Sequence, residues 1–153
     1  MNYQEEIRDL FTVSDEYALV HCISSDFALG AGIAKEINTR FDTKRELFDK
    51  YPDYINTFAE YSKMNSFGDC LVTDRNRFVL NMVTKKWCWN KPTEKSFYES
   101  LLALRRIVVK NHIKKIAMPL IGCGLDQLKW EWVSTKIKQV FADVDIDILV
   151  CKI

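Results

Sequence analysis

The chain of 153 residues is long enough for one domain with a sizeable core, since 48% of its residues are hydrophobic. Its 22 Lys and Arg residues balance 21 Asp and Glu residues, and a net charge of +1 excludes a global field that would draw it to nucleic acid or membranes. Five cysteines without a CxxC pair and only two histidines argue against a disulfide framework and a zinc site. With no signal-peptide pattern at the acidic start and no long apolar run, we expect one soluble, cytoplasmic domain spanning 1–153.

Apolar periodicity divides the chain into strand-like and helix-like segments. In chain order, the pattern predicts a weak strand at 4–11, a strand at 17–24, helices at 31–41 and 43–61 with a break near Pro52, strands at 69–73 and 77–84, a helix at 93–112 capped by Thr93, a strand at 115–122, a helix at 129–142 and a strand at 145–153. Strands that are apolar throughout and alternate with helices favour an α/β fold. Its sheet of six strands would be mixed, mostly parallel and covered on both faces.

Two glycine-bearing loops follow predicted strands and precede predicted helices: "SSDFALGAGIAKE" after 17–24, and "IGCGLD" within and after 115–122. Glycine backbone at a helix N-terminus suits a diphosphate. The first loop is no dinucleotide fingerprint, because Lys35 stands where a third small residue belongs, and no P-loop motif is present. Each loop alone is explained as well by a tight turn with a helix cap, whereas the pair favours an anion site.

Few side chains near these loops have the chemistry of a catalyst. Lys85 and Lys86 end the strand at 77–84, and strand alternation directs at most one of them to a site; two solvated lysines are the alternative. Asp126 follows the second loop, where a helix cap explains it equally well. His21 and Cys22 lie in an apolar strand and are expected as core residues rather than a base and a nucleophile.

Two further features suggest chemistry but have simpler structural explanations. Cys123 lies between two glycines, where a helix N-terminus would lower a thiol pKa, yet no base is identified near it. The segments "WCWNKPT" and "WEW" offer aromatic side chains for base stacking, but a net charge near zero favours core or pocket walls.

Three segments in this order, "HCISSDFALGAGIAKEI", "MVTKKWCWNKPT" and "MPLIGCGLDQLKWEWVS", resemble the macrodomain family. The resemblance is strongest to the branch of the terminal ADP-ribose protein glycohydrolase and the DNA ADP-ribosyl glycohydrolase antitoxins. It implies a three-layer α/β/α fold that binds ADP-ribose across the strand ends, and catalysis without a metal or cofactor.

The resemblance also implies roles for individual residues. Lys85 would be the nucleophile and Asp126 the acid/base. Asp9 would contact the adenine amino group, although Arg8 precedes it where the branch usually has glycine. The remaining ligand-lining positions would be His21, Ser24, Gly30, Ala31, Gly32, Ile33, Gly122, Cys123, Gly124 and Leu125.

The function implied is removal of mono-ADP-ribose from glutamate or aspartate side chains, with deacylation of O-acetyl-ADP-ribose, by a monomer. Its partners would be ADP-ribose and mono-ADP-ribosylated protein. Three alternatives remain: an ADP-ribose reader, an ADP-ribose 1″-phosphate phosphatase, and a DNA ADP-ribosyl glycohydrolase. The last would use a basic rim formed by Lys85, Lys86, Lys91 and Lys95 on modified nucleic acid. A reader needs no reactive pair, so Lys85 and Asp126 favour an enzyme.

Overall fold

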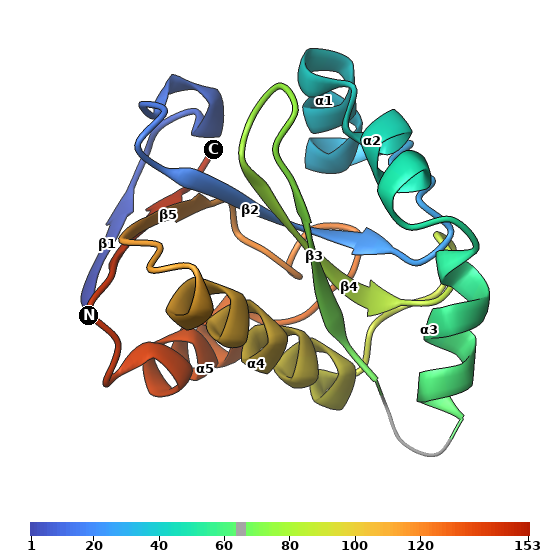
Figure 1. Ribbon diagram of the computed structural model, residues 1–153. Helices are drawn as coiled ribbons and strands as arrows, with labels where there is room; N and C mark the ends of the chain where they lie inside the picture. Colours follow the sequence, from blue (N-terminus) through green and yellow to red (C-terminus); the bar gives the residue numbers. More distant parts are fainter. Residues whose placement is uncertain (64–66) are drawn as a thin grey trace.

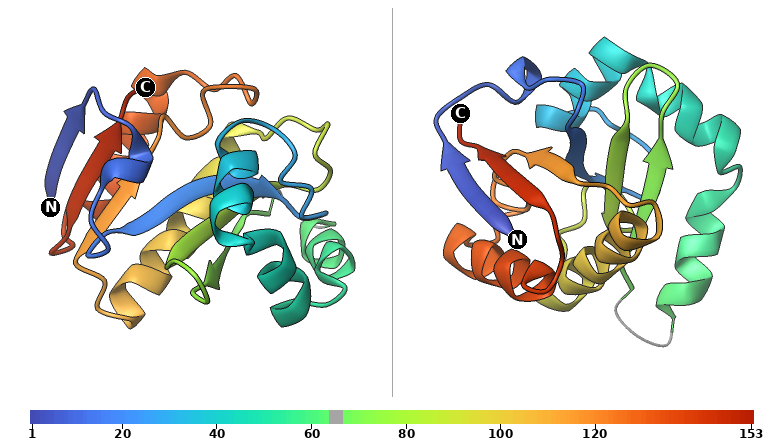
Figure 2. Two further views of the ribbon diagram at one scale, coloured as in Figure 1. Left: turned by 90° about the horizontal axis from the view of Figure 1, so that it is seen from above. Right: turned by 60° about the vertical axis from the view of Figure 1, so that its left-hand side comes forward.

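A six-stranded sheet forms the centre of the molecule in a computed structural model that describes residues 1–63 and 67–153 (Figure 1). Its strands are β1 (Asn2–Glu6), β2 (Ala18–Ser24), β3 (Asp69–Thr73), β4 (Val79–Lys85), β5 (Lys115–Met118) and β6 (Asp147–Cys151). The spatial order is β1-β6-β5-β2-β4-β3, and every neighbouring pair is parallel except β3 with β4. The first and last strands of the chain therefore lie side by side, and their pairing brings residues from the two ends of the sequence together (Figure 2).

Helices cover both faces of this sheet, as Figure 2 shows, which confirms the predicted three-layer α/β/α fold. They are α1 (Gly32–Phe41), α2 (Thr43–Lys50), α3 (Tyr54–Ser62), α4 (Glu94–Lys110) and α5 (Trp130–Phe141). Side chains alternate between the two faces of the sheet along β2, so this strand contributes to two cores. Val20 packs in the core on the α4 and α5 face, and Leu19 packs with Ile37 of α1 in the core on the opposite face. Among the described residues, no helix combines the length and apolar character needed to cross a membrane.

Most predicted elements occur with shifted ends. The second helical segment breaks as expected around Pro52, between α2 and α3. The strand predicted over 115–122 ends at Met118, because Pro119 cannot donate to a ladder. The strand predicted over 4–11 was placed wrongly: β1 ends at Glu6, and Asp9 caps a short 3-10 helix, Leu10–Thr12, through the Phe11 N–H.

Candidate active site

A cavity of about 460 Å³ opens at the carboxyl ends of β2, β4 and β5, between the loops 25–31 and 119–129. Every predicted site residue except Asp9 lines it: His21, Ser24, Gly30, Ala31, Gly32, Ile33, Lys85, Gly122, Cys123, Gly124, Leu125 and Asp126. The lining also includes Leu29, Cys88, Leu120 and Ile153, which sequence reasoning missed because isolated apolar side chains carry no site signal. The two glycine loops therefore face one shared space.

Asp9 lies outside the cavity lining. Its carboxylate accepts the Phe11 N–H at 2.8 Å. The preceding Arg8 donates to the hydroxyl of Thr12 at 3.0 Å and pairs with Glu6 at 3.3 Å. Both side chains thus hold the turn after β1, and contact between Asp9 and a ligand stays a prediction.

Lys85 and Asp126 meet inside the cavity although 41 positions separate them in sequence. Lys85 Nζ lies 2.6 Å from Asp126 Oδ1, and the two side chains are 14% and 12% exposed. Lys85 ends β4, whereas Lys86 turns away and places its Nζ 5.4 Å from the ring centre of Trp87. The helix-cap interpretation of Asp126 is wrong, because α5 begins after Lys129 and Asp126 pairs with Lys85 instead.

Two of the glycines in the loops, Gly32 and Gly124, leave open space at the cavity in addition to allowing tight turns. A Cβ added at Gly32 or Gly124 would meet no protein atom within 4 Å, so both face open space. The residue before α1, Ala31, makes no side-chain cap, and the first N–H groups of that helix have no side-chain partner from it. Uncapped N–H groups beside open glycine backbone are suited to bind phosphate oxygens.

His21 is a buried structural residue at the floor of the cavity. Its Nε2–H donates to Asn81 Oδ1 at 2.6 Å, and the Asn81 amide donates in turn to Leu71 O and Thr73 Oγ1. Burial lowers the pKa of His21 to about 4, against the opposing effect of the Asn81 bond, so the imidazole is neutral at neutral pH.

Two of the thiols that line the cavity, those of Cys22 and Cys123, are not activated. Burial raises the pKa of Cys123 to about 11, and burial also raises the pKa of Cys22. Both groups therefore stay protonated at neutral pH, which argues against either thiol as a nucleophile.

Asp26 fixes the geometry between the loops and was missed by sequence reasoning. Its Oδ1 accepts from the Ser24 hydroxyl at 2.5 Å and the Ala28 N–H at 3.2 Å, while its Oδ2 accepts the Cys88 N–H at 3.0 Å. An Asp that bonds backbone two residues later is a turn signal that the sequence carried. Asp26 thereby joins the first glycine loop to the segment after β4.

No group of three His, Cys, Asp or Glu side chains is arranged to hold a metal within the described ranges.

The chain matches the Macro domain family over residues 20–137. It is 37% identical to the ADP-ribose glycohydrolase OARD1 of Bos taurus over 93% of this chain and 86% of that protein. Among solved structures, the macrodomain of Thermus aquaticus DarG superposes with a TM-score of 0.75 at 21% identity over 97% of both chains. Thermosipho africanus DarTG in complex with ADP-ribose gives a TM-score of 0.74 at 20% identity, over 99% of this chain and 42% of that one. The chain belongs to the Macro domain family.

Proposed function

We propose that this protein is an ADP-ribose hydrolase that removes mono-ADP-ribose from glutamate and aspartate side chains and deacylates O-acetyl-ADP-ribose. The observation that carries the proposal is the 2.6 Å contact between Lys85 Nζ and Asp126 Oδ1 inside the glycine-lined cavity. The name ADP-ribose glycohydrolase borne by the similar bovine protein, and the ADP-ribose bound in the Thermosipho africanus structure, support the same ligand.

The bound ligand would span the two glycine loops. The uncapped start of α1 and the open backbone of Gly32 and Gly124 suit the diphosphate. The distal ribose would then lie beside Lys85 and Asp126, with its anomeric carbon C1″ facing the lysine. His21 forms the neutral floor, which adds no competing charge.

The reaction follows from these two side chains. An ammonium has no lone pair, so Asp126 first accepts a proton from Lys85 Nζ. The lone pair forms an Nζ–C1″ bond while the C1″–O bond breaks and its electron pair leaves with the carboxylate. A carboxylate whose acid has a pKa of about 4.3 departs without a strong general acid. Water then attacks C1″ while the C1″–N bond breaks and its electron pair returns to Nζ. The attacking water loses one proton to solvent, Asp126 returns its proton to the Nζ amine, and ADP-ribose is released.

A non-catalytic reader explains the cavity but not the reactive pair. Two half-buried, oppositely charged groups in direct contact carry a desolvation cost, which a pure binding site has no need to bear. An ADP-ribose 1″-phosphate phosphatase would release inorganic phosphate from the 1″-phosphate ester and leave a glutamate-linked substrate intact. Release of ADP-ribose from the glutamate-linked substrate therefore separates both alternatives from the proposal.

The test is time-resolved release of ADP-ribose from a glutamate-linked mono-ADP-ribosylated protein. We expect release by the wild type and a rate lower by a factor on the order of 10³ for Lys85→Ala, since loss of a nucleophile removes the covalent route. Binding of free ADP-ribose by that variant, measured by calorimetry, should persist. The matched control is Lys86→Ala, whose side chain lies over Trp87 and should not affect the rate. Equal loss in both variants would contradict the assignment of Lys85.

Asp126→Ala tests the second role. Asp126 takes part in both proton transfers, so release of ADP-ribose should fall in this variant, and any adduct that forms should persist and add the mass of an ADP-ribosyl group to the intact protein. Full turnover by Asp126→Ala would show that the reaction needs neither proton transfer by Asp126 nor its contact with Lys85, and would contradict the assigned role.

A further inference from the structure

The strand that ends in Lys85 carries an extra residue directly before this lysine. β2 and β4 pair without interruption up to Ile23 opposite Val83, but the next residue of β2, Ser24, lies opposite Lys85. Thr84 therefore falls between two pairs and forms a β-bulge in β4. Bulges are common beside active sites, where they change the direction of a neighbouring side chain.

The bulge changes which of two adjacent lysines faces the cavity. Successive side chains of a strand alternate between the faces of a sheet, so in a regular β4 Lys85 would share the face of Val83. Lys86 would then share the face of Ser24. The extra residue reverses this, because it brings Lys85 opposite Ser24. Cys22 lies on the same face of β2 as Ser24, and although burial is the main cause of its raised pKa, the nearby charge of Lys85 opposes that effect.

Two residues of the loop after β2 hold the backbone beyond the bulge. Ser25 donates its N–H to Lys85 O at 2.9 Å and its hydroxyl to Lys86 O at 2.7 Å. Asp26 Oδ2 accepts the Cys88 N–H at 3.0 Å. Ser25 is only 1% exposed, so water has little access to compete for its bonds. This clamp, formed by Ser25 and Asp26, fixes the backbone that carries both lysines.

The contact made by Lys85 tolerates little displacement. Its Nζ lies 2.6 Å from Asp126 Oδ1, a distance that permits direct proton transfer. A shift of about 1 Å in a reacting group lowers a rate by a factor on the order of 10². A bulge interrupts the regular ladder of backbone bonds, so bonds from outside the ladder are needed to hold the strand in its shifted register.

We infer that Ser25 and Asp26 are positioning residues, which hold the β4 bulge in the register that directs Lys85, rather than Lys86, into the cavity. Neither residue lines the cavity, so they act through the lysine and not on the ligand. The effect on catalysis rests on the proposed function, but the choice between the two lysines does not.

The first test separates the rate of the reaction from binding. Ser25→Ala removes the hydroxyl that bonds to Lys86 O and adds no atoms. Asp26→Asn keeps one oxygen but puts an amide NH2 in place of the oxygen that accepts the Cys88 N–H. We expect each variant to lower kcat for ADP-ribose release by a factor of about 10 to 100, because the nucleophile is displaced. Calorimetry should give an affinity for free ADP-ribose close to that of the wild type.

The matched control is Tyr51→Phe, which removes a hydroxyl that also bonds to strand backbone, at Val72 O of β3, 3.0 Å away. This variant should lower the free energy of unfolding and leave kcat unchanged. An unchanged kcat in both clamp variants would overturn the inference. So would an equal fall of kcat in Tyr51→Phe, because loss of stability alone would then explain the effect.

The second test needs no turnover. Acetic anhydride acetylates accessible amines, and fragment ions in mass spectrometry assign the label to Lys85 or Lys86. In the wild type, Lys85 is 14% exposed and paired with Asp126, so it should react more slowly than Lys86. Both clamp variants should bring the two rates closer together, and a ratio equal to that of the wild type would overturn the inference. Absent release of ADP-ribose by the wild type, with the expected labelling, would contradict the proposed function and still support the assigned choice of lysine.

Discussion

Gly122 and Gly124 bracket Cys123 at the cavity, and the geometry gives the two glycines different roles. Gly122 has φ +75°, and a Cβ there would lie 3.0 Å from Phe97 Cε2 and 3.1 Å from Leu128 Cδ1. Gly124 has neither a positive φ nor a protein atom within 4 Å of an added Cβ. The first glycine is therefore required by the fold, and the second leaves room for a ligand.

Gly122→Ala should lower the free energy of unfolding by about 1–3 kcal/mol, because alanine is strained at positive φ and its methyl group presses on the core. Gly124→Ala should leave stability unchanged and weaken ADP-ribose binding, since its methyl group enters the cavity. Urea unfolding and calorimetry on both variants check this. Equal stability loss in the two variants would contradict the assigned roles.

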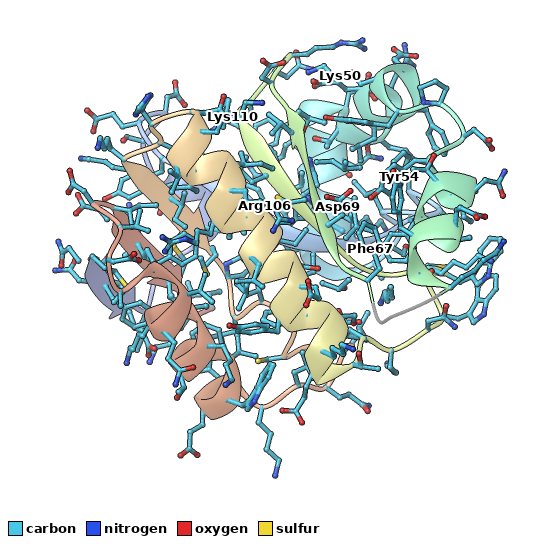
Figure 3. The ribbon with its side chains drawn as sticks, turned by 60° about the horizontal axis from the view of Figure 1, so that its bottom comes forward. Lys50, Tyr54, Phe67, Asp69, Arg106 and Lys110 are labelled. Atoms are coloured by element: carbon cyan, nitrogen blue, oxygen red, sulfur yellow. The ribbon has the colours of Figure 1, made fainter. Side chains whose placement is uncertain are left out.

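At the scale of elements, buried and half-buried side chains of α2 and its C-terminal turn protect the outer edge of the sheet. The hydroxyl of Tyr51 donates to Val72 O at 3.0 Å and accepts the Val72 N–H at 3.3 Å, so it occupies both outward groups of that residue of edge strand β3. Tyr54 of α3 donates to Asp69 of the same strand at 2.5 Å (Figure 3). Backbone groups satisfied in this way are not free to pair with another chain.

Glu46 of α2 extends this protection to the β3–β4 turn. It is 3% exposed, accepts the N–H groups of Asp74 at 2.7 Å and Arg75 at 3.0 Å, and pairs with Lys50 at 2.8 Å. The hydrogen bonds that Lys50 donates, first to Glu46 and then to Asp74, raise the pKa of Lys50, so the charged groups of this cluster stabilise one another.

Glu46→Gln should therefore destabilise the protein by about 1–3 kcal/mol in urea unfolding, because its amide group cannot accept both N–H bonds and the Lys50 charge equally well. The control is Asp49→Asn on the same helix, whose exposed pair with Arg75 is screened by solvent and should contribute little to the free energy of unfolding. A larger effect at Asp49 would show that the ion pair at the surface, rather than Glu46, anchors the turn.

At the scale of the whole molecule, sequence patterns predict elements better than their arrangement. Periodicity located α1 to α5, the helices of the described residues, and the direction of the Lys85 side chain follows from strand alternation together with the resemblance. The strand order could not be read, because the pairing of β1 with β6 joins residues from the two ends of the chain. Trp89 also escaped prediction: an aromatic residue in an apolar segment is normally buried, and only the turn at Asn90 shows that it is not.

The effect of the single residue His21 extends to the whole sheet, because a line of polar side chains, joined by hydrogen bonds, runs from it across three strands. The ring on β2 donates to Asn81 on β4, whose amide donates to Thr73 on β3, and all three side chains are buried. Burial holds the pKa of His21 at about 4, whereas an unfolded histidine titrates near 6.5. Below pH 6.5 the unfolded chain binds a proton that the folded chain does not, so stability falls with pH down to about 4.

This difference predicts a loss of about 2 kcal/mol of unfolding free energy between pH 7 and pH 5 that is due to His21 alone. His21→Gln keeps a donor toward Asn81 but does not titrate, so its stability should change less over that interval. Urea unfolding of both proteins at the two pH values measures the difference and cancels the contribution of carboxylates. An identical pH dependence would mean that the buried ring takes up a proton between pH 7 and pH 5 as readily as in the unfolded chain, and the polar line across the sheet would then carry a charge at pH 5.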